Sequence, residues 1–294
     1  MSPLFNPIRQ LLFPVRMFFV VCIALLIVVC LIVLGNRTQP AFHETVTIDG
    51  SVGKLVGEVQ RPSVKAGRVP TVIICHGLTG WRSENHLMAV NDSLLAHGYA
   101  TVRFDFNGHG ESEGEFKDMT LGKEIADLGC IYDYVAGLKW VDKSRIAVAG
   151  HSQGGFVAGV FAGDKGASAV KCAVLLAPAA CIYTMARDSS FFGLPIDIDN
   201  LPESLPFWGG RRLGRDYLLE AHSLNVYERT GAYNGPVLIL QGTADDPGLI
   251  RDAAEYPKYL RDCKYVELEG LSHCYPENYA LPARLTLSFI KENL

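Results

Sequence analysis

The sequence predicts an α/β fold whose central sheet is mostly parallel and doubly wound, with one long insertion. Three observations lead to this prediction. Apolar runs that suit strands alternate with helical stretches across residues 44–294, an order typical of parallel sheets covered by helices. Several of these runs are continuously apolar, as in TVIICHG at 71–77, which indicates strands buried on both faces. Residues 179–234 interrupt the alternation.

The expected elements follow one another in a regular order. Two short runs, at 45–48 and 54–59, predict an antiparallel pair at the start of the domain. Further strands are predicted at 71–77, 100–106, 145–150, 170–178, 236–242 and 264–270. Helices are predicted at about 84–97 and 120–138, after the turn that follows 145–150 as far as about 163, near 250–261, and from about 277 onward.

The insertion at about 179–234 is rich in proline, glycine and aromatic residues, as in GLPIDIDNLPESLPFWGG. A long irregular segment inside a regular α/β chain is usually functional. It follows directly after a predicted strand, so it can fold over the carboxyl ends of the strands, where such folds bind ligands. We therefore interpret it as a lid.

The segment at 17–34, MFFVVCIALLIVVCLIVL, holds 18 apolar residues without a charge. As a helix it would be about 27 Å long, close to the thickness of the hydrocarbon core of a bilayer. We predict an uncleaved transmembrane anchor between a flank at 1–16 and a connector at 35–43. A cleaved signal peptide and a buried core helix are the alternatives. Arg9 and Arg16 precede the segment and Arg37 alone follows closely, which predicts a single-pass cell-membrane protein whose domain lies outside the cytoplasm.

Charge and cysteine content exclude several functions. The net charge is −4 and no basic stripe is visible, so nucleic acid is not an expected partner. The eight cysteines show neither a C-x-x-C metal spacing nor a disulfide framework. We expect free thiols, and neither a metal nor a cofactor.

The stretch AVAGHSQGGFVAGVFAG at 147–163 places Ser152 among glycines where an apolar run becomes helical. Glycine loses more conformational entropy on folding than any other residue. A cluster of glycines therefore indicates a place where larger side chains would clash. The G-x-S-x-G nucleophile elbow is such a place, since it exposes a serine oxygen on a sharp strand-to-helix turn. The short pattern alone is weak, because it also arises by chance.

Two further residues complete a catalytic order. A serine hydroxyl needs a base, and the base needs a third group to orient it. Asp245 follows the strand PVLILQG and His273 follows the strand KYVELEG, so the chain order serine, aspartate, histidine suits this fold. Each residue has another interpretation: Asp245 or Asp246 can cap the next helix ahead of Pro247, and His273 can be a surface loop residue.

A reaction through a tetrahedral intermediate needs two donors for the oxyanion. The backbone N–H of Gln153, next to the serine, supplies one. The loop HGLTG at 76–80 follows a predicted strand and supplies the other from Leu78. The alternative is that these glycines only form a turn.

The motifs HGLTG, VRFDFNGHGESEGEF, GHSQGG, VLLAPAA, QGTADD and LEGLSHCY occur in this order between residues 45 and 294. In this order and spacing the chain resembles the α/β-hydrolase family of serine hydrolases, and within it the bacterial cinnamoyl (feruloyl) esterases. The resemblance implies Ser152 as nucleophile, His273 as base, Asp245 as its orienting group, and Leu78 and Gln153 as oxyanion donors.

The resemblance also implies substrate-binding residues in the lid. Its relatives hold the phenol hydroxyl of a hydroxycinnamate with polar lid residues. Tyr217 can do so here, whereas the early lid positions hold the apolar residues Met185 and Phe192, and Trp208 adds an aromatic surface. We expect these four residues to contact the substrate.

These observations predict a membrane-anchored serine carboxylesterase that acts through an acyl-enzyme on small-molecule esters, short acyl or hydroxycinnamoyl. Three alternatives stay open. The first is a monoacylglycerol lipase or thioesterase, and the second is a serine aminopeptidase-like hydrolase, which needs acidic residues for a free amine. The third is an inactive hydrolase fold used as a binding module.

Overall fold

The computed structural model describes residues 38, 39, 41–65 and 67–294. The predicted anchor at 17–34 and the flank before it lie outside these residues. Within the described ranges, no helix is both long and apolar enough to cross a membrane. A short antiparallel ribbon, β1 (Thr38–Gln39) with β4 (Val64–Lys65), belongs to one compact unit. The other unit, 41–62 with 68–294, holds all the elements described below.

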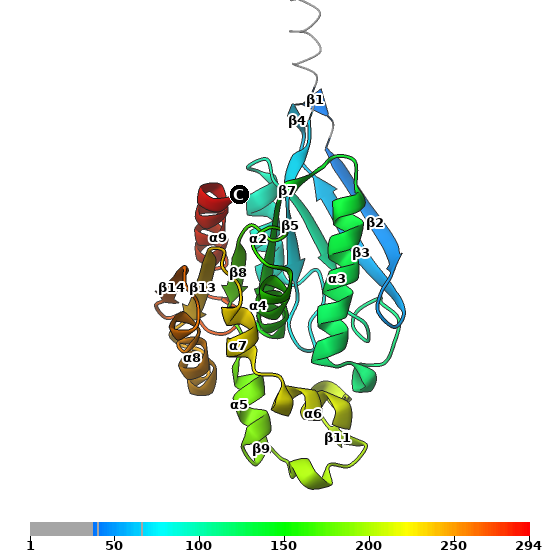
Figure 1. The fold of residues 1–294 in the computed structure, drawn as a ribbon, viewed down its shortest axis with the longest axis vertical. Helices are drawn as coiled ribbons and strands as arrows, with labels where there is room; N and C mark the ends of the chain where they lie inside the picture. The colour runs from blue at the N-terminus through cyan, green and yellow to red at the C-terminus, as the bar shows by residue number, and fades with distance from the viewer. Residues whose placement is uncertain (1–37, 40, 66) are drawn as a thin grey trace, which may run out of the picture. The chain divides into compact units, whose positions relative to one another are not determined.

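The core of this second unit is an eight-stranded sheet in the order β14-β13-β8-β7-β5-β6-β3-β2 (Figure 1). Neighbouring strands from β14 to β6 are parallel, whereas β3 is antiparallel to both β6 and β2. The predicted mostly parallel sheet and the predicted antiparallel pair are therefore confirmed. The strands are β2 (Phe42–Asp49), β3 (Lys54–Arg61), β5 (Val69–Cys75), β6 (Ala100–Phe104), β7 (Val141–His151), β8 (Ala173–Leu176), β13 (Val237–Gly242) and β14 (Cys263–Leu268).

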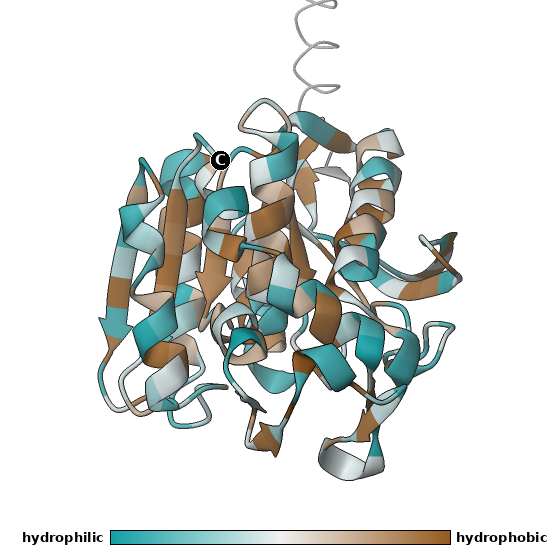
Figure 2. Cartoon of the chain, turned by 60° about the horizontal axis from the view of Figure 1, so that its bottom comes forward, coloured by the Kyte–Doolittle hydropathy of each residue, from teal (hydrophilic) through white to brown (hydrophobic). Residues whose placement is uncertain are grey.

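Helices cover both faces of the sheet, so its central strands are buried on both sides. Alternate residues of β5 show this, because Ile73 packs in the apolar cluster with α3 and α4 while Ile74 packs in the cluster with α2 and α9. Figure 2 shows hydrophobic residues concentrated along these strands. The flanking helices are α2 (Asn85–Leu95), α3 (Leu121–Gly137), α4 (Gln153–Lys165), α7 (Val226–Gly231), α8 (Pro247–Ala253) and α9 (Ala280–Asn293).

One helix differs from the prediction. The sequence pattern placed a helix at about 250–261, but α8 begins at Pro247 and ends at Ala253. The helix begins earlier than predicted for two reasons. The Asp246 carboxylate caps it by accepting a hydrogen bond from the backbone N–H of Gly248, and proline suits the first helical position. The chain then forms only a 3₁₀ turn, η4 (Tyr256–Lys258).

The insertion at 179–234, for which the name lid is kept, consists of short helices and hairpins between β8 and β13, in the lower part of Figure 1. Two hairpins pair β9 with β10 and β11 with β12. The lid elements before α7 are α5 (Cys181–Arg187), β9 (Ser190–Phe191), β10 (Leu194–Pro195), η2 (Ile198–Asn200), β11 (Ser204–Pro206), η3 (Trp208–Gly210), β12 (Arg212–Gly214) and α6 (Arg215–Ser223).

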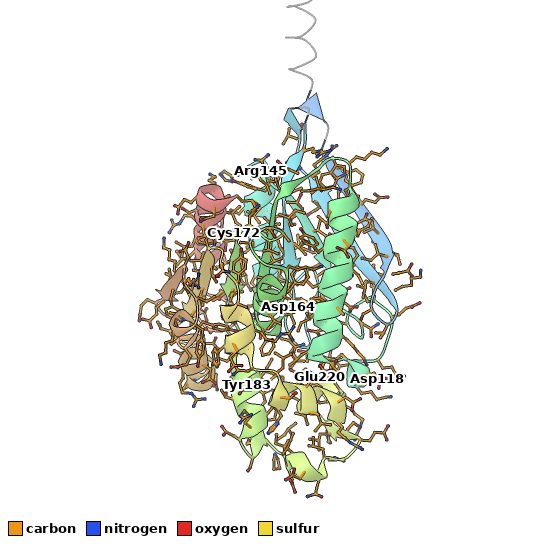
Figure 3. All side chains as sticks on the ribbon, viewed as in Figure 1. Asp118, Arg145, Asp164, Cys172, Tyr183 and Glu220 are labelled. Atoms are coloured by element: carbon orange, nitrogen blue, oxygen red, sulfur yellow. The ribbon has the colours of Figure 1, made fainter. Side chains whose placement is uncertain are left out.

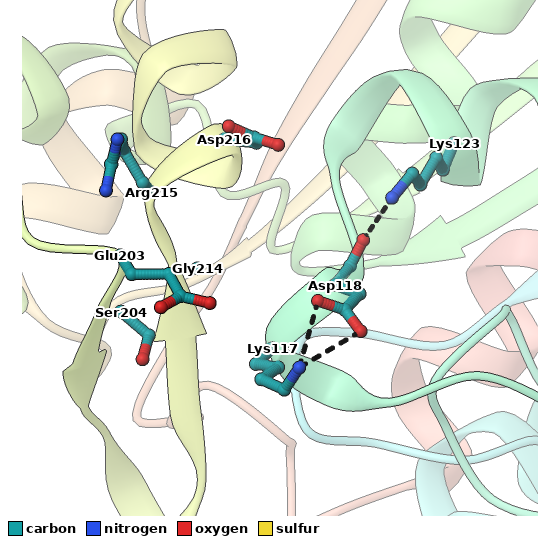
Figure 4. Close-up of a pocket in the computed structure, with 8 residues that line it drawn as sticks. All are labelled: Lys117, Asp118, Lys123, Glu203, Ser204, Gly214, Arg215 and Asp216. Atoms are coloured by element: carbon teal, nitrogen blue, oxygen red, sulfur yellow. Dashed lines mark hydrogen bonds and ion pairs between the residues drawn. The ribbon is translucent and has the colours of Figure 1, made fainter.

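Close contacts join the lid to the sheet's flanking helices. The Glu220 carboxylate of α6 accepts a hydrogen bond from the backbone N–H of Gly122 in α3 at 2.7 Å (Figure 3). A Cβ at Gly214 would collide with the carbonyl oxygen of Lys117 in η1 (Phe116–Asp118), so only glycine fits there. A polar crevice of about 240 Å³ opens at this junction (Figure 4). Basic and acidic side chains line the crevice in equal number, so its charges do not favour an ion of either sign.

Candidate active site

Ser152 lies on the sharp turn between β7 and α4, with φ 57° and ψ −122°. A non-glycine residue in this region is strained, and such strain costs about 1–3 kcal/mol. The glycines around it allow the turn to form: a Cβ at Gly150 would collide with the carbonyl of Gly154, and a Cβ at Gly154 with the carbonyl of His76. The turn thus has the shape that the glycine pattern predicted.

The structure brings Ser152, His273 and Asp245 together. Ser152 Oγ lies 2.9 Å from His273 Nε2, and His273 Nδ1 lies 2.8 Å from Asp245 Oδ2. Each residue comes just after the carboxyl end of a parallel strand, β7, β14 and β13 respectively, and these ends meet at one edge of the sheet. The arrangement lets a proton move from the serine to a histidine that the aspartate orients.

The two neighbouring aspartates have different roles. Asp245 is almost fully buried, with its side chain 1% exposed. Its carboxylate also accepts hydrogen bonds from Gln241 Nε2 at 2.9 Å and from the backbone N–H of Asp246 at 2.7 Å. Asp246 caps α8 instead. The capping interpretation therefore applies to Asp246, and Asp245 faces the histidine.

Two further histidines pack in a row beside His273: His151 contacts it, and His86 packs on His151. His151 Nε2 donates a hydrogen bond to the carbonyl oxygen of His273 at 2.9 Å. The ring of His86 packs on His151 with 4.1 Å between centroids. Burial lowers the pKa of His86 to about 4 and that of His151 well below its ordinary value, so both rings stay neutral. Sequence reasoning missed this contact, since no spacing rule links residues 122 positions apart.

The backbone amides of Leu78 and Gln153 flank the serine. Leu78 lines the cavity that contains Ser152. Gln153 is the first residue of α4, where the N–H has no acceptor within the helix. Among the residues that the structure describes, neither amide donates a hydrogen bond to the protein. Both N–H groups are therefore available to an oxyanion.

The side chain of Gln153 points away from the cavity into a buried polar chain. Its Nε2 donates to Glu124 Oε2 at 2.8 Å, and its Oε1 accepts from the hydroxyl of Tyr217 at 2.6 Å. Glu124 comes from α3 and Tyr217 from the lid helix α6. This chain connects the lid to the residue whose amide faces the oxyanion position. Nothing in the sequence marks Glu124, because its role depends on burial.

Burial raises the pKa of Glu124 to about 8, which predicts a pH-dependent effect on stability. Below pH 4.5 both states hold the proton, whereas between about 4.5 and 8 only the unfolded chain releases it. The free energy of unfolding therefore falls as pH rises through this window. We expect Glu124→Gln to raise the melting temperature relative to wild type more at pH 8 than at pH 5. The gain should be at least about 1 kcal/mol, or roughly 2–4 °C.

Differential scanning calorimetry at the two pH values checks this expectation. Tyr217→Phe is the matched control, since it removes a hydrogen bond from the same chain without removing a carboxyl group. Its difference from wild type should be the same at both pH values. A constant difference for Glu124→Gln would show that Glu124 is charged in the folded protein.

The catalytic cavity, defined as the space that Ser152 lines, has a volume of about 220 Å³. Of the four lid residues expected to contact the substrate, Phe192 and Trp208 line it. Tyr217 does not, because its side chain is fully buried and its hydroxyl is bound to Gln153. Met185 does not either: it packs against the apolar core. Sequence reasoning missed other lining residues, Glu84, Ala179, Ile182, Leu249 and Cys274.

Among the described residues, no cluster of histidine, cysteine or acidic side chains has the arrangement of a metal site. The six cysteines of this part of the chain are free, and Cys75, Cys172 and Cys181 are buried. Burial raises the pKa of the Cys172 thiol to about 12.

Comparisons with known proteins agree with this geometry. Residues 68–193 match the protein family described as Serine aminopeptidase, S33. The structure of Est1E from Butyrivibrio proteoclasticus with bound ferulic acid is 34% identical, with a TM-score of 0.80 over 84% of this chain and 98% of that chain. An uncharacterized protein of Mycobacterium tuberculosis is 29% identical over 266 residues, 88% of this chain and 82% of that protein.

A third relative is the mitochondrial palmitoyl-protein thioesterase ABHD10 of Homo sapiens. It is 26% identical over 189 residues, which cover 61% of this chain and 58% of the relative. The identity to Est1E extends over almost the whole of that protein, and the fold places a serine, a histidine and an aspartate at the strand ends. This chain therefore belongs to the α/β-hydrolase family, as a protein of the serine hydrolase type.

Proposed function

We propose that this protein is a carboxylic ester hydrolase that uses Ser152 as its nucleophile. The observation that supports this most directly is the hydrogen-bonded series Ser152–His273–Asp245 at the wall of the catalytic cavity. The backbone N–H groups of Leu78 and Gln153 donate no hydrogen bond to the described residues and are available beside it. An inactive binding module would have no need to keep this complete set.

The geometry supports a two-step reaction. Ser152 Oγ attacks the ester carbonyl carbon while His273 Nε2 accepts the hydroxyl proton. The amides of Leu78 and Gln153 stabilise the negative oxygen of the tetrahedral intermediate. His273 then gives the proton to the departing alcohol oxygen, which leaves an acyl-enzyme on Ser152. Water, deprotonated by His273, attacks the acyl carbon, and the bond from this carbon to Ser152 Oγ breaks. His273 returns the proton to Ser152 Oγ, and the carboxylic acid leaves.

The lining of the cavity supports an apolar acyl group of modest size. Ile182, Phe192, Trp208 and Leu249 provide aliphatic and aromatic surface, and burying such a group contributes about 1.5–3 kcal/mol. The similar Est1E structure contains ferulic acid, which favours an aromatic acyl group. Tyr217, however, is bound to Gln153. We therefore propose short acyl and cinnamoyl esters as substrates, with no polar lid partner for a phenol hydroxyl.

Hydrolysis of a graded ester series by the full-length protein tests this proposal. Aryl acetate, butyrate, octanoate and laurate esters should show highest kcat/KM at the short chains. Methyl cinnamate should exceed methyl ferulate by about tenfold, since an unpaired buried hydroxyl costs about 1–3 kcal/mol. A preference for laurate would indicate a lipase. A preference for ferulate would show that a polar group binds the phenol after all.

Two other hydrolase functions have specific support. The similarity to a palmitoyl-protein thioesterase favours thioesters, which use the same acyl-enzyme chemistry. The match to the family described as Serine aminopeptidase favours amides with a free amino group. Acyl-CoA thioesters and aminoacyl p-nitroanilides, assayed beside the esters, distinguish these functions by their relative kcat/KM.

We also propose that residues 17–34 anchor the protein in the cell membrane, with residues 44–294 outside the cytoplasm. The support is the 18-residue apolar run and the arginines before it. The full-length protein should stay with membranes in alkaline carbonate, and external protease should digest the domain in intact spheroplasts. Release by carbonate would contradict the anchor, and protection from protease the orientation.

A further inference from the structure

Glu84 is an acidic side chain in the wall of the catalytic cavity. It lies at the end of the loop that follows β5, directly before α2. The same cavity wall contains Ser152, His273 and Cys274. Electrostatic interactions couple the Glu84 carboxyl to His273, and Cys274 to Glu84. Glu84 therefore lies within electrostatic range of His273 and Cys274, which are adjacent in the sequence.

The Glu84 carboxylate does not cap the helix that follows it. Glu84 is the residue before the first turn of α2, yet its side chain makes no capping hydrogen bond to that helix. The carboxylate instead lies against the α-carbon of Gly80, where a Cβ would collide with Glu84 Oε2. Glycine at position 80 thus makes room for the carboxylate beside the cavity.

No cation of the described residues neutralises Glu84. The nearest basic atom is His86 Nε2, 3.9 Å away, and His86 is buried and neutral. Arg82 is nearby in sequence but pairs with Asp105, Glu58 and Glu111. The Glu84 side chain is only 21% exposed, and burial raises its pKa to about 7. The backbone N–H of Trp81 donates one hydrogen bond to this carboxyl, and the remaining lone pairs can accept a hydrogen bond from a ligand in the cavity.

We propose that Glu84 binds the alcohol portion of the substrate by accepting a hydrogen bond from a hydroxyl or ammonium group. This inference rests on the proposed ester hydrolysis. His273 Nε2 must reach the departing ester oxygen to protonate it, so the alcohol portion lies on the histidine side, beside Glu84. The acyl portion faces the apolar side chains Ile182, Phe192 and Leu249. Glu84 is therefore a specificity residue for donor-bearing alcohols.

Three butyrate esters with one acyl group and different alcohols test this role in the full-length protein. Propyl butyrate has no donor, 2,3-dihydroxypropyl butyrate has hydroxyls, and 3-(dimethylamino)propyl butyrate has an ammonium N–H at pH 7.5. Glu84→Ala should lower kcat/KM for the two donor-bearing esters by about tenfold, and change propyl butyrate by less than about twofold. Wild type should prefer at least one donor-bearing ester to propyl butyrate.

Glu84→Gln separates the two kinds of donor while keeping the shape of the side chain. Its amide oxygen still accepts from a hydroxyl, so the dihydroxypropyl ester should lose less than about threefold. The ammonium ester, which needs the negative charge, should lose about tenfold. Glu269→Ala removes an exposed carboxylate far along the chain and should change none of the three rates.

Two results would overturn the role of Glu84 while leaving ester hydrolysis intact. One is an equal loss for all three esters in Glu84→Ala and Glu84→Gln, which would assign Glu84 a general structural function. The other is no change for any ester. If wild type hydrolyses none of the esters, the proposed function fails and this inference fails with it.

Discussion

Ser152→Ala should abolish ester hydrolysis, with kcat/KM lower than wild type by at least about 10⁴-fold. The serine oxygen is the atom that forms the acyl-enzyme, and no other hydroxyl lies at the turn between β7 and α4. Alanine keeps the Cβ and tolerates the same φ of 57° as well as serine does. We therefore expect the free energy of unfolding to change by less than about 1 kcal/mol, which calorimetry measures beside the rates.

A surface serine provides the matched control. Ser288 is exposed on α9, and Ser288→Ala should keep both activity and melting temperature. Mass spectrometry adds an independent readout, because an aryl phosphonate should label the peptide that contains Ser152 and should not label Ser152→Ala. Full activity in a folded Ser152→Ala protein would disprove nucleophilic catalysis by this residue.

Asp245→Asn should lower kcat/KM by about 10³–10⁴-fold. The buried carboxylate accepts from three donors, His273 Nδ1, Gln241 Nε2 and the N–H of Asp246. An asparagine amide has one oxygen and one NH₂ group, so in either orientation at least one of these donors faces another donor. If the NH₂ group faces His273, the ring is held in the wrong tautomer. The imidazolium formed during reaction also loses its negative partner.

The neighbouring residue gives a control of the same chemical type. Asp246→Asn makes the same substitution one position later, where the side chain caps α8. Asparagine caps helices as well as aspartate does, so activity should stay within about twofold. Equal losses from the two substitutions, measured as kcat/KM at temperatures well below both melting transitions, would show that Asp245 has only a structural role.

The two aspartates also show how far local patterns reach. The sequence Asp246-Pro247 is a recognisable start of a helix, and the helix does begin there rather than three residues later. That same signal made capping an alternative for Asp245. Local rules cannot separate two adjacent carboxylates, because the decisive contact is with His273, 28 residues further along the chain.

The lid shows where sequence reasoning failed. Phe192 and Trp208 line the cavity as expected, whereas Tyr217 and Met185 do not. Composition indicated that the insertion is aromatic, but the direction of each side chain depends on contacts with distant elements. Tyr217 is drawn away from the cavity by Gln153 of α4, which lies 64 residues earlier.

The sequence by itself determined the alternation of strands and helices, the serine turn and the chain order of its partners. These features follow from periodicity, glycine sterics and strand ends, all of which act over a few residues. Only the tertiary structure decided which acidic side chains are buried without a neutralising cation. Glu84 and Glu124 are ordinary acidic residues in the sequence. Their properties arise because desolvation and hydrogen bonding depend on neighbours that folding brings from distant parts of the chain.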